Sequence, residues 1–202
     1  MTEASHPETR IADALPDHWA DRVLPGWTRP YARLMRLERP IGWWLLLLLG
    51  AQVALGGWVS TNYAVLACME FPTCQGSHWP AMDFAQGFTL WRPLGLQPDG
   101  SPISFEALTA IHMVHRWMAG TLVLVIALVV WQLRTYPALR RPMQLLGLLL
   151  ALQLATGLSN VVLGWPLLAA VLHTGGAGAM LACLVWLLTV SRVPVNRPVA
   201  MP

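Results

Sequence analysis

The chain has 202 residues, of which 55% are hydrophobic and only 11% are charged. A soluble globular domain carries about 25% charged residues, so this composition excludes an ordinary soluble protein and indicates a lipid solvent. The formal net charge is +3, and every basic residue is an arginine. Because these arginines lie between apolar stretches and form no basic patch, we expect no nucleic-acid partner.

The first 40 residues are polar and are interrupted by prolines. They lack the basic-then-apolar order and the small-residue cleavage site of a secretory signal peptide. We therefore expect residues 1–40 to be a cytoplasmic tail. Within this tail, 30–39 is either a short interfacial helix or an ordinary linker.

Four apolar stretches follow, and each is long enough to cross a bilayer, which takes about 20 helical residues. They cover 41–59, 107–133, 143–163 and 167–190. The sequence predicts an all-α fold: an integral membrane four-helix bundle over 41–191, with a C-terminal tail at 192–202. The segment between the first two spans is longer than a simple connector, and we expect it to cap the bundle, with a short helix near 82–88.

The arginines are distributed unevenly between the two sides of the predicted membrane protein. Six precede the first span, three lie between the second and third, and two follow the fourth, whereas the long loop 60–106 contains only Arg92. Cytoplasmic loops carry the excess of basic residues. The sequence therefore predicts a multi-pass protein of the bacterial inner membrane, with both termini cytoplasmic and the long loop outside.

Two histidines, His115 and His173, lie about two turns into the second and fourth spans. These two spans run in the same direction, so both imidazoles are expected at similar depth near the outer surface. Two imidazoles at one level on parallel helices can face each other across a haem iron. We therefore predict His115 and His173 as the axial ligands of a b-type haem.

The four spans also read as a duplicated helix pair, in which each second helix carries one of these histidines. Both histidines are followed four and five residues later by alanine and glycine, and the first and third spans share the pattern Gln-x-x-x-Gly. The residues concerned are Ala119, Gly120, Ala177, Gly178, Gln52, Gly56, Gln153 and Gly157. The small residues one turn below each histidine leave room for a porphyrin face; the alternative is that they only allow close helix packing. The glutamines are expected to form hydrogen bonds between helices.

Two further polar residues of the second span are candidates for the same site. His112 lies one turn before His115 and is expected to share its face, either as an alternative ligand or pocket group or as a solvated histidine at the membrane edge. Arg116 could pair with a haem propionate, or it could reach to lipid headgroups.

Cys68 and Cys74 lie six positions apart in the outer loop. An oxidising compartment permits a disulfide between them, and the turn at Pro72 could bring the ends together. The alternatives are a zinc site, for which only His78 is nearby as a third ligand, and two free thiols.

Several stretches together resemble the haem A synthase family over about 49–191. They are Gln52-Val-Ala-Leu-Gly-Gly-Trp-Val-Ser-Thr-Asn-Tyr-Ala, Ala67-Cys-Met-Glu-Phe-Pro-Thr-Cys-Gln-Gly, Ala110-Ile-His-Met-Val-His-Arg, Gln153-Leu-Ala-Thr-Gly-Leu-Ser-Asn-Val-Val-Leu-Gly and Ala170-Val-Leu-His-Thr. Family members usually have two similar four-helix halves. The N-terminal half oxidises the C8 methyl group of haem O toward haem A, and the C-terminal half holds a b-type haem between two histidines.

The resemblance implies the same assignments, with His115, Arg116 and His173 at the haem and Cys68 and Cys74 as the outer-loop pair. In the family's catalytic half, a glutamate stands three residues before the His-Arg histidine; here that position is His112. The chain therefore resembles the cofactor half, with the catalytic half absent. Activity is then expected to need a partner half or a homodimer, with haem O as the substrate.

The first 50 residues resemble a different family. Asp13-Ala-Leu-Pro-Asp-His-Trp-Ala-Asp and Trp27-Thr-Arg-Pro-Tyr-Ala-Arg-Leu-Met-Arg-Leu-Glu-Arg-Pro-Ile-Gly-Trp-Trp-Leu-Leu-Leu-Leu are similar to the N-terminus of 4-hydroxybenzoate polyprenyltransferase. The Asp-rich motifs that bind Mg²⁺-diphosphate in that family are missing. Three hypotheses follow: a haem A synthase-type module, a di-histidine cytochrome b-like protein without catalysis, and a prenyltransferase remnant.

Overall fold

The computed structural model describes residues 25–26, 40–134 and 136–190. The chain divides into two units, 1–44 and 45–202, and the helical domain is the second. The interfacial helix considered at 30–39 and the tail at 192–202 lie outside the described residues.

Four long helices occupy the places predicted for the membrane spans. They are α3 (Pro40–Thr61), α5 (Phe105–Leu133), α6 (Arg140–Val162) and α7 (Leu167–Val190). Each contains a segment long and apolar enough to cross a membrane, which confirms the predicted all-α membrane bundle. Helix α5 begins two residues earlier than predicted because Ser104 caps it: the Ser104 hydroxyl accepts a hydrogen bond from the Ala107 amide.

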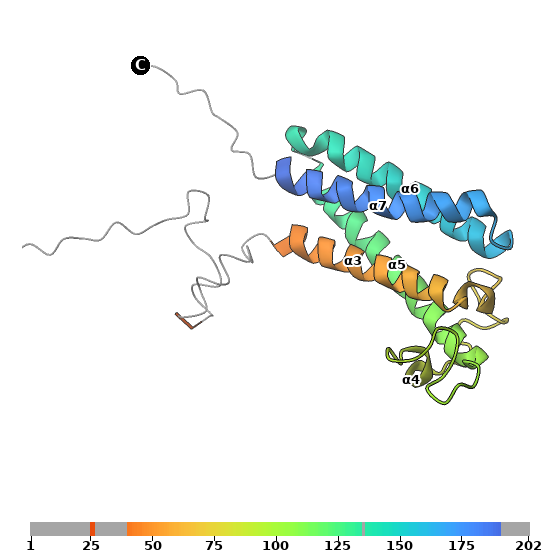
Figure 1. Ribbon diagram of the computed structural model, residues 1–202. Coiled ribbons are helices and arrows are strands. Elements are labelled where there is room, and N and C mark those ends of the chain that lie inside the picture. The colour runs from red at the N-terminus through yellow and green to blue at the C-terminus, as the bar shows by residue number, and fades with distance from the viewer. Residues whose placement is uncertain (1–24, 27–39, 135, 191–202) are drawn as a thin grey trace, which may run out of the picture. The chain divides into compact units, whose positions relative to one another are not determined.

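Helices α6 and α7 lie side by side as a hairpin (Figure 1). Gly164 and Trp165 in the turn both have positive φ, at 68° and 66°. The Trp165 amide donates to the Asn160 carbonyl, so the turn satisfies a backbone acceptor at the end of α6. This short connection makes the two helices antiparallel neighbours and brings their facing side chains into register.

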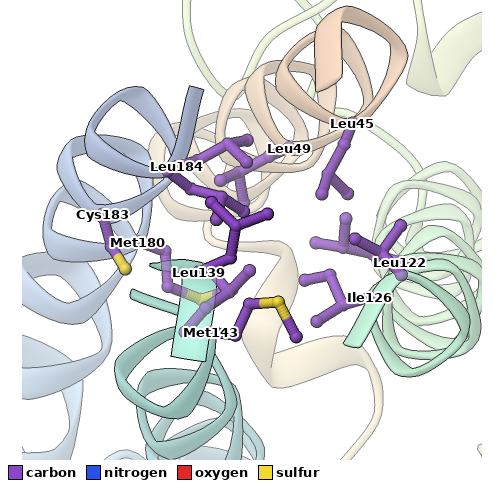
Figure 2. Close-up of a cluster of buried hydrophobic side chains, with 12 residues drawn as sticks. Leu45, Leu49, Leu122, Ile126, Leu139, Met143, Met180, Cys183 and Leu184 are labelled. Carbon is purple, nitrogen blue, oxygen red and sulfur yellow. The ribbon is translucent and has the colours of Figure 1, made fainter. Parts of the chain in front are cut away.

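The main core lies where the four helices meet. Figure 2 shows side chains from all of them converging, among them Leu49 of α3, Ile126 of α5, Met143 of α6 and Leu184 of α7. The opposite faces of the helices are apolar too, and many of their large side chains are exposed. A helix that is apolar on all sides is expected where lipid replaces water around it.

The outer loop folds over the ends of α3 and α5, as predicted. It contains a 3₁₀ helix, η1 (Ala64–Ala67), and one short α-helix, α4 (Phe84–Gly87), which corresponds to the helix expected near 82–88. Gly87 packs so closely on α5 that a Cβ atom there would lie 2.9 Å from the Ala107 carbonyl oxygen. The Trp58 indole of α3 donates to the Gly87 carbonyl at 3.0 Å. These contacts attach the loop to both helices.

Candidate haem-ligand site

His115 of α5 packs directly against α3. A Cβ atom on Gly56 would lie only 3.2 Å from the His115 Cε1 atom, so the imidazole occupies the space that a side chain at position 56 would need. The Gln52 Nε2 atom lies 3.1 Å from His115 Nδ1 and 3.3 Å from the His115 carbonyl oxygen, to which it donates. A glycine and a glutamine one turn apart on α3 therefore position this histidine.

His173 of α7 makes the same kind of contact with α6. A Cβ atom on Gly157 would lie 3.0 Å from the His173 Cε1 atom, and the Gln153 amide donates to the His173 carbonyl at 2.8 Å. The Thr156 hydroxyl oxygen lies 3.0 Å from His173 Nδ1. The residue at the matching position of α3 is Leu55, so the two sites differ in the partner of the ring nitrogen.

The duplicated Gln-x-x-x-Gly pattern thus corresponds to a contact with a histidine that is repeated in the two helix pairs. In each helix pair the glycine admits the imidazole and the glutamine amide bonds to the histidine's backbone, which confirms the expectation that the glutamines bond between helices. Both rings are partly buried, and the Gln52 Oε1 atom beside one of them is buried without a hydrogen-bond partner.

The structure gives His112 different neighbours from His115. Its side chain is only 3% exposed, and its Nδ1 atom lies 3.0 Å from the Ala64 carbonyl oxygen of η1, which accepts a hydrogen bond from it. The His112 ring therefore packs against the outer loop, whereas the His115 ring packs against α3. His112 is a buried polar group with a backbone partner, which is not the solvated edge position considered from the sequence.

The Arg116 guanidinium is directed into the disulfide loop. It donates to three backbone carbonyls, those of Cys68, Glu70 and Thr73, at 2.8–3.1 Å. Its Nε atom is buried without a partner. Arg116 therefore connects the loop to the helix turn that carries His115, and its contact with a propionate or a lipid headgroup stays a prediction.

Cys68 and Cys74 form a disulfide, with their Cα atoms 4.9 Å apart, and both are fully buried. The Cys74 amide donates to the Ser77 carbonyl at 2.9 Å, and the Gln75 side chain donates to the Thr109 hydroxyl of α5, also at 2.9 Å. Within the described ranges, no group of three or more His, Cys, Asp or Glu residues is placed to hold a metal ion. The disulfide here closes a short loop that is attached to the histidine-bearing part of α5.

Sequence reasoning did not identify Thr156, and it used Gly56 and Gly157 only as parts of the repeated Gln-x-x-x-Gly pattern. The signal for the glycines was present, because each stands four residues after a glutamine in a repeated pattern. No such signal exists for Thr156, since the repeat is broken at that position by Leu55. Its relation to His173 depends on how α6 packs on α7.

In the part of the chain that the structure describes, four helices long and apolar enough to span a membrane, with a duplicated histidine–glycine contact, define a polytopic membrane protein built from two related helix pairs. More particularly, the chain belongs to the COX15-CtaA family, described as cytochrome oxidase assembly protein, whose model matches residues 22–185. This confirms the family resemblance found from the sequence motifs. The similarity of the first 50 residues to a polyprenyltransferase stays a prediction.

The chain is similar to proteins named heme A synthase. It is 36% identical over 141 residues to the one from Shewanella oneidensis, covering 70% of this chain and 42% of that protein. It is 32% identical over 160 residues to the one from Rhodospirillum centenum, covering 77% of this chain and 40% of that protein. The chain thus spans less than half the length of these relatives. No solved structure matches it.

Proposed function

We propose that this chain is a haem-binding membrane module of haem A synthesis, in which His115 and His173 ligate the iron of a b-type haem. The proposal is supported by the relatives named heme A synthase and by imidazole being a common axial ligand of haem iron. Under this proposal the chain corresponds to the cofactor half of a longer enzyme, and its partners are the lipid bilayer, the haem and a catalytic half.

The observation that carries the proposal is the repeated contact of an imidazole with a glycine. Glycine at 56 and at 157 lets the Cε1 atom of each ring approach the neighbouring helix, and a glutamine from that helix holds the histidine's backbone. Two partly buried imidazoles without a ligand would cost free energy in an apolar environment. A metal bound to one nitrogen of each ring removes part of that cost.

The residues present fit such a group. A haem iron needs two axial protein ligands, and two partly buried histidines are available on α5 and α7. When bound, a bis-histidine haem supplies one-electron transfer. Oxidation of a methyl to a formyl group, written with water as the oxygen source, is R–CH₃ + H₂O → R–CHO + 4H⁺ + 4e⁻. We therefore assign this chain to electron transfer, toward an external acceptor that takes up the four electrons, such as two quinones or four ferric cytochromes.

We assign the oxidation itself to a partner, either a separate catalytic half or a second copy of this chain. The position that resembles the family's catalytic glutamate holds His112, whose Nδ1 atom is already bonded to the Ala64 carbonyl. That observation also supports a second candidate: a di-histidine, cytochrome b-like protein that holds haem or transfers electrons without catalysis.

Optical and EPR spectra of the purified protein in detergent, loaded with haem, test the ligand assignment. Wild type should show a six-coordinate low-spin haem, and His115→Ala or His173→Ala should abolish that species. His112→Ala serves as the matched control in the same helix and should shift the spectrum only modestly. Haem binding that survives His115→Ala but not His112→Ala would refute the assignment.

Pigment extraction separates the two candidate functions. Membranes containing this chain and haem O, with an electron acceptor, should yield haem A only when a catalytic half or an active homodimer is present. If the chain binds haem and exchanges electrons but forms no haem A under any of these conditions, the cytochrome-like function is the correct one.

A further inference from the structure

The Thr156 hydroxyl has three neighbours, and their chemistry determines which way its single proton points. It donates to the Leu152 carbonyl at 2.8 Å, with the Gln153 carbonyl at 3.3 Å, and it lies 3.0 Å from His173 Nδ1. A hydroxyl has one proton and two lone pairs. Because the proton is engaged by a backbone carbonyl, the Thr156 oxygen can only accept from the imidazole. Nδ1 of His173 therefore carries the proton, and Nε2 is left with a free lone pair.

His115 has no such acceptor at its ring. The Gln52 amide nitrogen lies 3.1 Å from His115 Nδ1 and 3.4 Å from His115 Nε2, and it can only donate. A donor therefore faces both ring nitrogens, and no acceptor fixes the proton of the neutral ring on either of them. The Gln52 Oε1 atom is buried without a partner. Turning this amide so that Oε1 faces Nδ1 would move the proton to Nδ1 and leave Nε2 free.

We propose that the two histidines are prepared unequally for a metal: Thr156 holds His173 in the tautomer with a free Nε2 atom, whereas His115 is held in that tautomer only when the Gln52 amide turns its Oε1 atom toward Nδ1. This inference rests on the proposed function. A ligating histidine usually donates its second ring N–H to a fixed acceptor, which sets the tautomer and the ring orientation. Thr156 and Gln52 are thus positioning residues, and His173 is the ligand already set when haem arrives.

The difference between the two sites follows from one position of the repeat. Gln153 donates to the His173 backbone carbonyl at 2.8 Å, so the ring nitrogen is left to Thr156. In the first helix pair Leu55 replaces the threonine, and an apolar side chain cannot bond to a ring nitrogen. The Gln52 amide therefore serves both the backbone and the ring of His115.

Nitrogen NMR of ligand-free protein in detergent tests this directly, with ¹⁵N-labelled histidine and assignment from His115→Gln and His173→Gln spectra. Wild type should show His173 protonated at Nδ1 and His115 divided between its two tautomers. Protonation of His173 at Nε2, or a His115 ring held wholly in the Nδ1-protonated form, would overturn the proposal. This readout contains no haem, so it can fail independently of the proposed function.

Three threonine variants complete the test. Thr156→Val removes the acceptor at nearly constant shape, and it should shift His173 toward the Nε2-protonated form and weaken haem binding about 10- to 100-fold. Thr156→Ser should keep wild-type behaviour in both measurements. Thr174→Val, whose wild-type hydroxyl bonds to Ala170 in α7 at an exposed position, should change neither.

The outcomes distinguish a failure of the proposed function from a failure of the role given to Thr156. If wild type binds no haem, the proposed function fails while the tautomer result still stands or falls by NMR. If wild type binds haem and Thr156→Val matches it in both tautomer and affinity, the role of Thr156 is wrong and the ligand assignment is unaffected.

Discussion

At the residue scale, two glycines matter because they have no side chain where a histidine ring approaches. Gly56 and Gly157 are the points at which the histidine rings approach a neighbouring helix, at 3.2 and 3.0 Å from where a Cβ atom would stand. Contacts this short would force a ring to move, because each imidazole is attached to a helix packed in the bundle. Other glycines of the same helices have nothing within 4 Å of that position, as at Gly57 and Gly147.

We predict that Gly157→Ala displaces the His173 ring and lowers haem occupancy, while Gly147→Ala on the same helix leaves it unchanged. The added methyl at 147 meets open space, and alanine favours a helix over glycine by about 1 kcal/mol. The measurement is the haem-to-protein ratio after purification. Equal loss of haem in both variants would show that the glycine acts through helix stability alone.

Arg116 gives a second prediction at this scale. Its fork of donors binds three carbonyls of one loop, and the compact ammonium group of lysine cannot reproduce that geometry. Arg116→Lys should release the loop at a cost of about 1.5–3 kcal/mol, which is on the order of a tenfold or greater increase in amide exchange.

Hydrogen exchange followed by mass spectrometry on peptides covering 68–77 measures this effect. Arg141→Lys, an exposed position on α6, is the control and should leave the exchange of those peptides unchanged. Unaltered exchange in Arg116→Lys would mean that the disulfide alone orders the loop.

At the element scale, the outer loop acts as a folded cap. Arg92 donates to Asn62 at 2.7 Å and to the carbonyls of Thr89 and Leu96 at 3.0 Å, and its guanidinium lies 5.6 Å from the centre of the Trp58 ring. Desolvation in this setting lowers the pKa of Arg92. The segment around Arg92 is thereby held at the end of α3, while Gln75 and Arg116 attach the disulfide segment to α5.

We predict that the disulfide contributes about 2 kcal/mol to the order of this cap, as expected for a short closed loop. Cys68→Ser should raise protease sensitivity within 68–77, with Cys183→Ser as the control in the buried part of α7. Alkylation of native membranes without reductant, followed by mass spectrometry, should leave Cys68 and Cys74 unmodified. Free thiols at both positions would contradict the pairing.

At the scale of the whole molecule, the spans contain few charged residues, so the orientation of the protein in the membrane depends on the segments that flank them. Arginines precede α3, stand at Arg134 after α5 and in the first turn of α6, and follow α7, whereas the cap contains Arg92 only. Basic residues stay preferentially on the cytoplasmic side. We predict that both termini face the cytoplasm. A reporter that works only in the cytoplasm should be active when it is fused after Arg197. Activity of a reporter that works only in the periplasm, fused at the same position, would refute this topology.

Much of this architecture could be predicted because lipid imposes simple demands on sequence. An apolar run of about 20 residues must form a helix to satisfy its backbone, so all four spans were predicted within three residues of their observed ends. The repeat of Gln-x-x-x-Gly and of the histidines is likewise visible in the linear chain. These features depend on local composition and spacing.

Only the tertiary structure decided which side chains meet. His112 and His115 are one turn apart, yet one faces η1 and the other α3, because the cap covers the outer end of α5. Arg116 is bound by loop carbonyls, and Thr156 faces His173 because of how α6 packs on α7. Such contacts join residues that are distant in sequence, and their partners follow from helix rotation and loop path, which composition does not encode.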